Sequence, residues 1–564
     1  MTIVQELRTL IDDVRKIRGF ERVTVVTPTK QASFYLRRAL ARGGLFNVDF
    51  KRLEDVAEQL AGREFKEPLL HDLQASEFVY EAARDPNLGT RLGGTEVSPQ
   101  LQTALHSTFR DLELLERGQL DRLKAVQREL VDRFDSYMNL ASQHRRGAAV
   151  AKRAAKMVRD GQGSGYTSPV VSGLGTVLLA KVAPVAPVQR LLFDALAKLQ
   201  DSAIVTTPDQ AFDDVMASDA AVPGAQKSSE SFRQKFVPVG VPDVAEEVRS
   251  VVREIVDLAR SDARGKTTNF ARMAVVFEDD TYATRVSEAF ELAGIPVSGP
   301  DRTALADSPE GQFVTGLLDI FENDFTRLDV TAWFSTAPVR NPSADRPVPA
   351  ARWDALSRTA GVTLSVRDSW IPRLDQYAAH RIARAERSDR LGEGRSNEIA
   401  AAISDSEYAL ALKEFVETFA NRSPTAEQDS WPGFGSWLRA MTKDYLLVVG
   451  SSSTDSTAVE NRQTRLTTLI ERLESLETPG KVPGFKHCAG VLREQMGRRS
   501  AGLRSLGSGV YVGPIWTAAG CPFDTVFILG MTEGRYPTAG ISDPLLPDKL
   551  KREIDAAGRY LRTV

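Results

Sequence analysis

The chain has 564 residues, so three to four subdomains are expected, because one hydrophobic core seldom grows this large. No uncharged apolar run reaches the ~18 residues of a membrane span, and the N-terminus lacks the pattern of a signal peptide. Two cysteines (Cys488 and Cys521) and five histidines exclude a disulfide framework and argue against a metal centre, and the net charge of −3 argues against a small basic DNA-binding module. We therefore expect a cytoplasmic protein with no membrane partner.

The N-terminal part alternates between helix and strand and then becomes helical. Apolar residues recur at helical spacing from Ile3 to Ile17, and Gly19 ends that pattern. In chain order we expect a helix at 3–17, a strand at 22–27, a helix at 31–42, a helical stretch from about 53 to 159 and a flexible break at 160–165.

The strand–helix pattern then returns. We expect strands at 169–171 and 176–179, a helix at 187–199 and a strand at 203–206. A strand–helix layout that is interrupted by ~100 helical residues and resumes is typical of an α/β domain with an inserted helical domain. The stretch 215–234 is poor in apolar residues and rich in Ala, Ser and Asp, so it is expected to be a linker.

A second α/β segment starts at 236–239 and is interrupted in the same way. Its expected elements are a helix at 244–259, a strand at 273–277, a helix at 282–293, a mainly helical region from about 328 to 506, and strand and turn chemistry from 509 to 537. The fold class expected from the pattern is therefore α/β, with two α/β domains that are each interrupted by a mainly helical insertion.

A Gly-Lys-Thr tripeptide at 265–267 looks like the end of a phosphate-binding loop. That loop needs a first glycine five residues before the second, where this chain has Arg260. It must also follow a strand and open a helix, whereas this tripeptide follows a helix and precedes a strand. The glycine-rich run 161–165 fails the same test, so neither predicts a nucleotide site.

The C-terminal run from Val510 to Pro537 carries the strongest motif. An apolar strand is followed by Trp516-Thr517-Ala518-Ala519-Gly520-Cys521-Pro522-Phe523-Asp524, then by a second apolar strand and by Gly530-Met531-Thr532-Glu533-Gly534-Arg535-Tyr536-Pro537. This order resembles motif V and the following strand of the UvrD/RecB-type superfamily 1 DNA helicases. The alternative is an ordinary strand–turn–strand.

Other segments resemble the same family in matching order. Val23 to Arg38 resembles motif Ia through Thr27, Thr29 and Ala32, and Met273 to Gly299 resembles motif IV. Ala180 to Gln189 takes the place of motif II, and Val205 to Phe212 resembles motif III. The resemblance implies two RecA-like domains of the P-loop NTPase type, at 1–62 with 168–235 and at 236–327 with 508–564, with helical insertions at 63–167 and 328–507.

The chain departs from the family at the residues that handle ATP. No phosphate loop precedes motif Ia, where an amphipathic helix stands instead. The departures inside the motifs are Ala180-Lys181 for the acidic pair that holds Mg²⁺, Thr206-Thr207 for Gly-Asp in motif III (Asp209 and Gln210 remain), Glu278 for an arginine after motif IV, and Trp516 and Ala519 for His and Lys in motif V. Without these groups nothing stabilises charge on a transferring phosphoryl group. We therefore expect neither ATP nor Mg²⁺ as a cofactor; the alternative is a weak ATPase that depends on Asp209 or Gln210.

A helicase body that has lost these groups resembles the AddB and RecC subunits of bacterial helicase–nucleases, the exonuclease V gamma-like proteins. The resemblance implies a DNA-handling scaffold beside an active AddA/RecB-like ATPase subunit. AddB-type chains continue into a PD-(D/E)XK nuclease domain with an iron–sulfur cluster, which we expect only if the natural protein extends past residue 564, where motif VI would also lie.

The resemblance places the turns of motifs Ia and V along a DNA strand. Thr27, Thr29 and Lys30 could donate to phosphates, a base could stack on Trp516, and Thr517 is a further candidate for a DNA contact. The alternative is that Trp516 is core and the threonines cap a helix. A basic stripe at helical spacing could line a DNA channel or be a solvated helix face: Arg145, Arg146, Lys152, Arg153, Lys156 and Arg159.

The leading hypothesis is a catalytically degenerate, helicase-like scaffold subunit that binds single-stranded DNA or a duplex end in double-strand break repair and recombination. One rival is that the chain is the helicase-like arm of a PD-(D/E)XK exonuclease whose nuclease domain lies beyond residue 564. A second rival is a pure protein-interaction scaffold. No residue of this chain is expected to be catalytic or to bind a metal or cofactor.

Overall fold

The computed structural model contains two compact units, Met1–Arg302 with Ala501–Val564, and Thr303–Ser500. Both units mix α-helices with short β-strands, and the sheets of four strands are parallel. The residues that it describes are 3–41, 44–89, 91–92, 97–164, 168–181, 185–206, 237–262, 269–279, 281–301, 304–391, 396–424, 430–447, 456–477, 484–498, 502–503, 506–533, 543–555 and 561. The expected linker at 215–234 and the Gly-Lys-Thr tripeptide at 265–267 lie outside them.

The first unit contains a parallel sheet in the strand order β2-β1-β3-β4. Its strands are β1 (Val23–Thr27), β2 (Val48–Arg52), β3 (Thr176–Lys181) and β4 (Ser202–Thr206). Every residue of β1 is buried, because this strand is central and both of its faces are covered. β2 was not predicted, because the sequence Val-Asp-Phe-Lys-Arg carries three charges on a half-buried edge strand.

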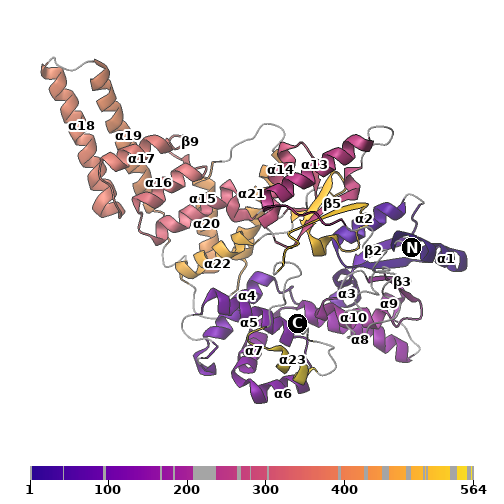
Figure 1. The fold of residues 1–564 in the computed structure, drawn as a ribbon. Coiled ribbons are helices and arrows are strands. Elements are labelled where there is room, and N and C mark those ends of the chain that lie inside the picture. The colour runs from indigo at the N-terminus through magenta and orange to yellow at the C-terminus, as the bar shows by residue number, and fades with distance from the viewer. Residues whose placement is uncertain are drawn as a thin grey trace. The chain divides into compact units, whose positions relative to one another are not determined.

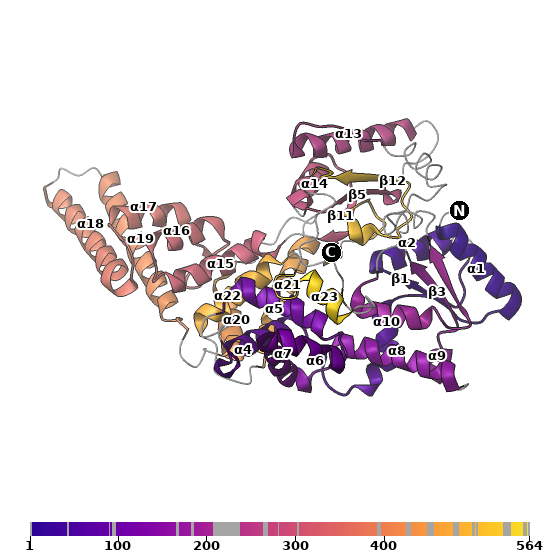
Figure 2. The same cartoon turned by 60° about the horizontal axis from the view of Figure 1, so that its bottom comes forward.

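Helices cover both faces of this sheet (Figure 2). One face packs against α1 (Ile3–Arg18) and α2 (Lys30–Ala41), with Leu7 and Leu36 fully buried. The other face packs against α3 (Leu53–Ala61), α8 (Gly147–Ser164) and α10 (Pro187–Leu196). The helices expected at 3–17, 31–42 and 187–199 are confirmed within a few residues of their ends.

Two local expectations for this part are wrong. Residues 160–164 of the break expected at 160–165 are the last turn of α8, and residue 165 lies outside the described part of the chain. The strand expected at 169–171 is the short helix α9 (Pro169–Ser172), in which proline occupies the first turn, where its missing N–H costs nothing. α8 packs against α3 and α10 and shares one apolar cluster with residues of β1 and β3, although the sequence assigned residues 63–167 to the insertion.

A helical insertion follows α3. It consists of α4 (Asp72–Arg84), α5 (Pro99–Leu112), α6 (Arg117–Val126) and α7 (Arg128–Leu140). Its core also contains Leu546, Ile554 and Leu561 from the C-terminal segment, whose helix is α23 (Asp548–Ile554). The expected assignment of 508–564 to the second α/β domain therefore does not describe this segment, which packs with the insertion helices instead.

A second parallel sheet of the same unit has the strand order β12-β5-β11-β6. Its strands are β5 (Met273–Phe277), β6 (Val297–Ser298), β11 (Val510–Pro514) and β12 (Thr525–Leu529). The helices α13 (Val244–Asp262) and α14 (Thr281–Leu292) share one apolar cluster with these strands. The described residues 237–240, at the expected start of this segment, form no strand, and Val237 and Val239 are exposed. A two-stranded antiparallel pair joins β7 (Pro300–Asp301) to β10 (Gly502–Leu503).

The second unit is mainly helical. Its helices are α15 (Pro309–Glu322), α16 (Arg327–Thr336), α17 (Ala350–Thr359), α18 (Ile371–Leu391), α19 (Ser396–Ala420), α20 (Trp431–Tyr445), α21 (Ser456–Glu474) and α22 (Phe485–Gly497), and a small hairpin pairs β8 (Arg340–Asn341) with β9 (Arg346–Pro347). Its core is aromatic: Trp333 packs on Phe419 and donates from its indole to the carbonyl of Phe313 (2.9 Å). α18 and α19 pack along each other as a long hairpin (Figure 1).

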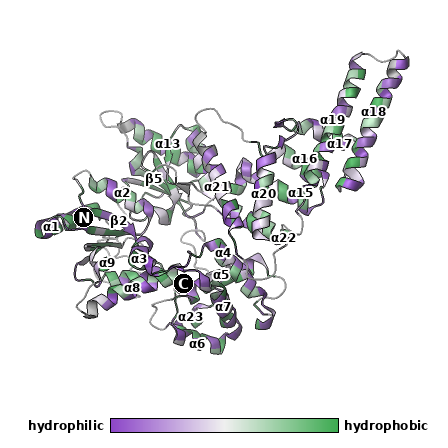
Figure 3. Ribbon diagram, turned by 180° about the vertical axis from the view of Figure 1, so that it is seen from behind, coloured by the Kyte–Doolittle hydropathy of each residue, from purple (hydrophilic) through white to green (hydrophobic). Residues whose placement is uncertain are grey.

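The helices of both units alternate hydrophilic and hydrophobic residues along their length (Figure 3), as expected for helices that bury one face. Within the described part of the chain, no helix is both long and apolar enough to cross a bilayer.

Candidate functional site

The carboxyl edge of the first sheet is where a nucleotide would be held if the chain kept the helicase motifs. Ala180, near the end of β3, is 6% exposed and packs in an apolar cluster with Leu7 and Val205. A buried methyl group therefore occupies the first of the two positions that the resemblance compares with motif II, and a methyl group can bind neither Mg²⁺ nor water. Thr207, Asp209 and Gln210 lie outside the described residues.

The segment before β1 is the helix α1, whose apolar side packs on the sheet through Ile3, Leu7 and Ile11. Ile17, which the sequence pattern placed on the same side, is exposed. At the end of β5 in the second sheet, the residue that replaces the expected arginine is Glu278, and it is exposed. Among the residues that the structure describes, no three His, Cys, Asp or Glu side chains gather as a metal-binding group.

The two threonines of the motif Ia turn have structural roles. Thr27 is buried, and its hydroxyl lies 2.5 Å from the hydroxyl of Ser33. The hydroxyl of Thr29 accepts a hydrogen bond from the backbone N–H of Ala32 (3.0 Å), which caps the first turn of α2. Lys30, the first residue of α2, is exposed. Of these three candidates, Lys30 is the side chain that projects into solvent.

The motif V turn is the 3₁₀ turn Ile515–Ala518, which follows β11. Thr517 is buried; its hydroxyl accepts a hydrogen bond from the hydroxyl of Tyr511 (2.6 Å) and donates to the carbonyl of Pro514 (2.6 Å). These bonds fix the turn, so Thr517 is a structural residue. Trp516 is 58% exposed, and the alternative interpretation of Trp516 as a core residue is wrong.

An aromatic cluster connects α2 to the motif V turn. The ring of Tyr35 packs edge-on against Phe523 (centroids 4.9 Å apart) and Tyr511 (6.1 Å), and its hydroxyl lies 3.4 Å from the hydroxyl of Ser298. Arg38 of the same helix donates to the carbonyl of Gly507 (2.8 Å). α2 and the turn 515–518 are therefore in contact, and the helix that begins with Lys30 lies beside the turn that carries Trp516.

Burial in this cluster raises the pKa values of two of its ionisable side chains. Burial raises the pKa of Tyr511 well above its ordinary value and raises the pKa of the Cys521 thiol to about 12. Both groups are therefore neutral at physiological pH, and Cys521 is not a reactive thiolate.

Two exposed residues of α2 were not among the predicted DNA contacts. Phe34 and Arg37 follow Lys30 by four and seven residues, a spacing that places them on one side of a helix. Phe34 is in edge-on contact with Tyr35. The helical spacing of Lys30, Phe34 and Arg37 is a signal that the sequence already contained.

Most of the basic stripe is engaged within the chain. Arg145 pairs with Glu58 (2.8 Å), Arg153 pairs with Glu64, and Lys152 donates to the backbone carbonyl of Glu113 (2.8 Å). The guanidinium of Arg146 lies 3.9 Å from the carboxylate of Glu113. The two remaining members, Lys156 and Arg159, are exposed. The stripe is therefore not one continuous charged surface, because its members face several different partners.

Comparison with models of protein families and with curated proteins finds no match to this chain.

Proposed function

We propose that this chain is a degenerate, helicase-like scaffold of the superfamily 1 type, with two RecA-like domains, that binds single-stranded DNA without hydrolysing ATP. Within this proposal it is an AddB/RecC-like subunit that works beside an AddA/RecB-like ATPase in the repair of double-strand breaks. The exonuclease and pure interaction alternatives gain no support from the arrangement of the described residues.

The observation that carries the proposal is the contact between α2 and the turn 515–518. These two segments carry the motifs that the resemblance associates with a DNA strand, although nearly 500 residues separate them in sequence. Each presents one exposed group suited to a single strand: the ammonium group of Lys30 for a phosphate and the indole of Trp516 for a base.

The loss of ATP hydrolysis is supported at both sheets. In the first sheet, Ala180 is packed in apolar surroundings and α1 takes the place of a phosphate loop. In the second sheet, an exposed carboxylate, Glu278, would repel a γ-phosphate at the position where the family has an arginine.

The test is fluorescence anisotropy of a labelled single-stranded oligonucleotide with the full chain, at several salt concentrations. Trp516→Ala should weaken binding by about 5- to 150-fold, because stacking of one base on an aromatic ring contributes about 1–3 kcal/mol. Lys30→Gln should weaken binding and reduce the slope of log affinity against log salt by about 0.7, because one phosphate contact is lost.

The matched control is Lys16→Gln on α1, a lysine whose side chain is 74% exposed and which lies outside the motif turns. It should leave both the affinity and the salt slope unchanged. An absence of binding at low salt would refute the proposal and favour the pure interaction scaffold. An ATPase activity stimulated by DNA, and lost in Asp209→Ala or Gln210→Ala, would refute the claim of lost hydrolysis.

A further inference from the structure

A cavity of about 850 Å³ lies in the first unit. Helices α3, α8 and α10, which cover the first sheet, form one part of its wall, and α4, α5 and α7 of the insertion form the other. α3 follows β2 directly, so this wall lies at the carboxyl edge of the sheet, where open α/β sheets hold ligands. The volume lies within the ~300–1,000 Å³ range of small-molecule sites.

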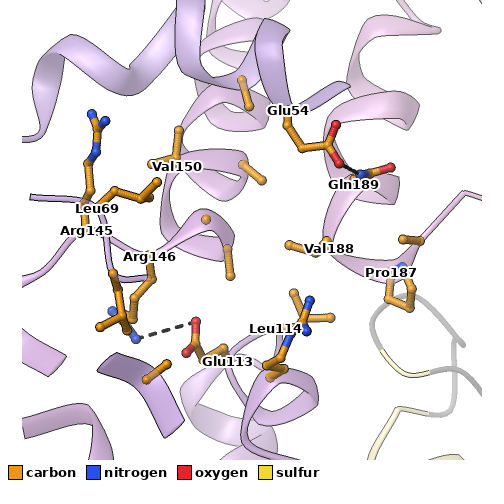
Figure 4. Close-up of a pocket in the computed structure, with 18 of the residues that line it drawn as sticks. Glu54, Leu69, Glu113, Leu114, Arg145, Arg146, Val150, Pro187, Val188 and Gln189 are labelled. Carbon is orange, nitrogen blue, oxygen red and sulfur yellow. Dashed lines mark hydrogen bonds and ion pairs between the residues drawn. The ribbon is translucent and has the colours of Figure 1, made fainter. Parts of the chain in front are cut away.

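The greater part of the wall is aliphatic. Leu53 and Leu192 contribute from α3 and α10, Leu114 contributes from the segment after α5, and Val150 contributes from α8. Figure 4 shows Leu114, Val150 and Val188 around the hollow between the charged groups. Such a surface favours an apolar ligand body, since each buried Å² of apolar surface contributes roughly 25 cal/mol.

One end of the cavity carries an excess of positive charge. The side chain of Glu113 is 8% exposed there; it accepts a hydrogen bond from the hydroxyl of Tyr137 (3.0 Å) and lies 3.9 Å from the guanidinium of Arg146. Arg110 and Lys152 also interact electrostatically with this carboxylate. Three cations therefore surround one acidic group.

The two arginines at this end are only weakly balanced, because the ion pair of Arg146 with Glu113 is long (3.9 Å) and Glu113 is shared with other cations. Arg146 contacts the sulfur atom of Met138, which is a weak acceptor, and its nearest carboxylate oxygen is beyond hydrogen-bond distance. Arg110 is exposed, and within the described part of the chain no carboxylate forms an ion pair with it. Burial raises the pKa of Glu113, which further weakens its ability to balance these charges.

Five further acidic residues line the cavity: Asp111 pairs with Lys551 (3.1 Å), Asp72 at the start of α4 is exposed, and the other three have partners within the chain. Glu58 pairs with Arg145 (2.8 Å), and Asp55 pairs with Arg52 (2.8 Å). Glu54 accepts a hydrogen bond from the amide of Gln189 on the opposite side of the hollow from Arg146 (Figure 4). Acidic residues outnumber basic ones on the wall as a whole, so the excess of positive charge is confined to the end where Arg110, Arg146 and Lys152 surround Glu113.

We propose that this cavity binds a small organic carboxylate with an apolar body. The carboxylate group of the ligand lies on Arg146 and Arg110, and its body packs against Leu114, Val150 and Leu192. None of the residues that line the cavity belongs to α2 or to the turn 515–518, although Lys30 interacts electrostatically with Asp55 of the wall. Variants of Arg146 and Arg110 therefore test this proposal without changing a proposed DNA contact.

The test is isothermal titration calorimetry of the full chain with octanoate, octylammonium and inorganic phosphate. Octanoate should bind with a stoichiometry of one, and octylammonium should not, because the two chains are equally apolar and differ in the sign of the charge. Arg146→Gln and Arg110→Gln should each weaken octanoate binding by about 10-fold or more, as expected for the loss of a charged hydrogen bond. The control Arg128→Gln changes an arginine of the same insertion whose side chain is 84% exposed, and it should have no effect.

Two further arms separate the remaining interpretations. Val150→Phe narrows the apolar part of the cavity and should weaken octanoate binding while the arginines remain in place. Binding of octylammonium as tight as that of octanoate, or octanoate binding that both arginine variants leave unchanged, would overturn the proposal. Binding of inorganic phosphate in place of octanoate, with the same dependence on Arg146, would assign the site to a phosphate group and would also overturn it.

Discussion

The substitution Tyr35→Ala tests how the two motif turns are held together. Tyr35 is 5% exposed, and its ring is the part of α2 that packs on Tyr511 and Phe523. Truncation of a buried aromatic side chain to alanine costs about 3–5 kcal/mol, because apolar burial is lost and a cavity remains. The hydroxyl contributes little of this, because its contact with Ser298 is long (3.4 Å). Tyr35→Phe should therefore cost about 1 kcal/mol or less.

Amide hydrogen exchange of the full chain measures this difference locally. In Tyr35→Ala, protection of the amides of α2 and β11 should fall by about two to four orders of magnitude, since 1.36 kcal/mol corresponds to a factor of ten. Tyr35→Ala should also weaken binding of a single-stranded oligonucleotide although Tyr35 is buried, and Tyr35→Phe should bind normally. Equal exchange in the two variants, or a loss of protection spread over both units, would refute the assignment of the contact to this ring.

Three further substitutions test the fold. Arg133→Met removes a fully buried guanidinium that donates hydrogen bonds to backbone carbonyls in the last turn of α4. It should lower the free energy of unfolding, measured in urea, by about 3–5 kcal/mol. A decrease of less than about 1 kcal/mol would contradict this role. Asp55 accepts hydrogen bonds from Arg52 that lower the pKa of its carboxyl group below the ordinary value. The stabilisation by Asp55 is therefore present above the unfolded-state pKa and is lost as the pH falls through the folded-state pKa. The melting temperatures of wild type and Asp55→Asn should accordingly converge in acid. Gly311→Ala would place a methyl group against the backbone carbonyl of Leu305 and should lower the thermal stability of the second unit by about 1–3 kcal/mol, which a differential scanning measurement would detect.

The sequence by itself determined the elements whose signal is local. α1, β1, β3, α10 and β5 lie where hydrophobic periodicity and turn residues predicted them, because burial of a helix face or of a central strand requires that pattern in the segment itself. The interrupted α/β organisation follows from the order of these elements. Lys30 and Trp516 were also identified from sequence, and both are exposed.

Tertiary structure decided everything that depends on a distant partner. β2 became a strand because β1 offers its edge, despite a charged sequence. Leu546, Ile554 and Leu561 joined the insertion core because their side chains are buried in one apolar cluster with residues of α4–α7. The residues of the basic stripe pair with separate carboxylates, and Tyr35 connects α2 with the turn 515–518. These contacts could not be predicted from local sequence, because folding sets the positions of carboxylates and rings that lie far along the chain.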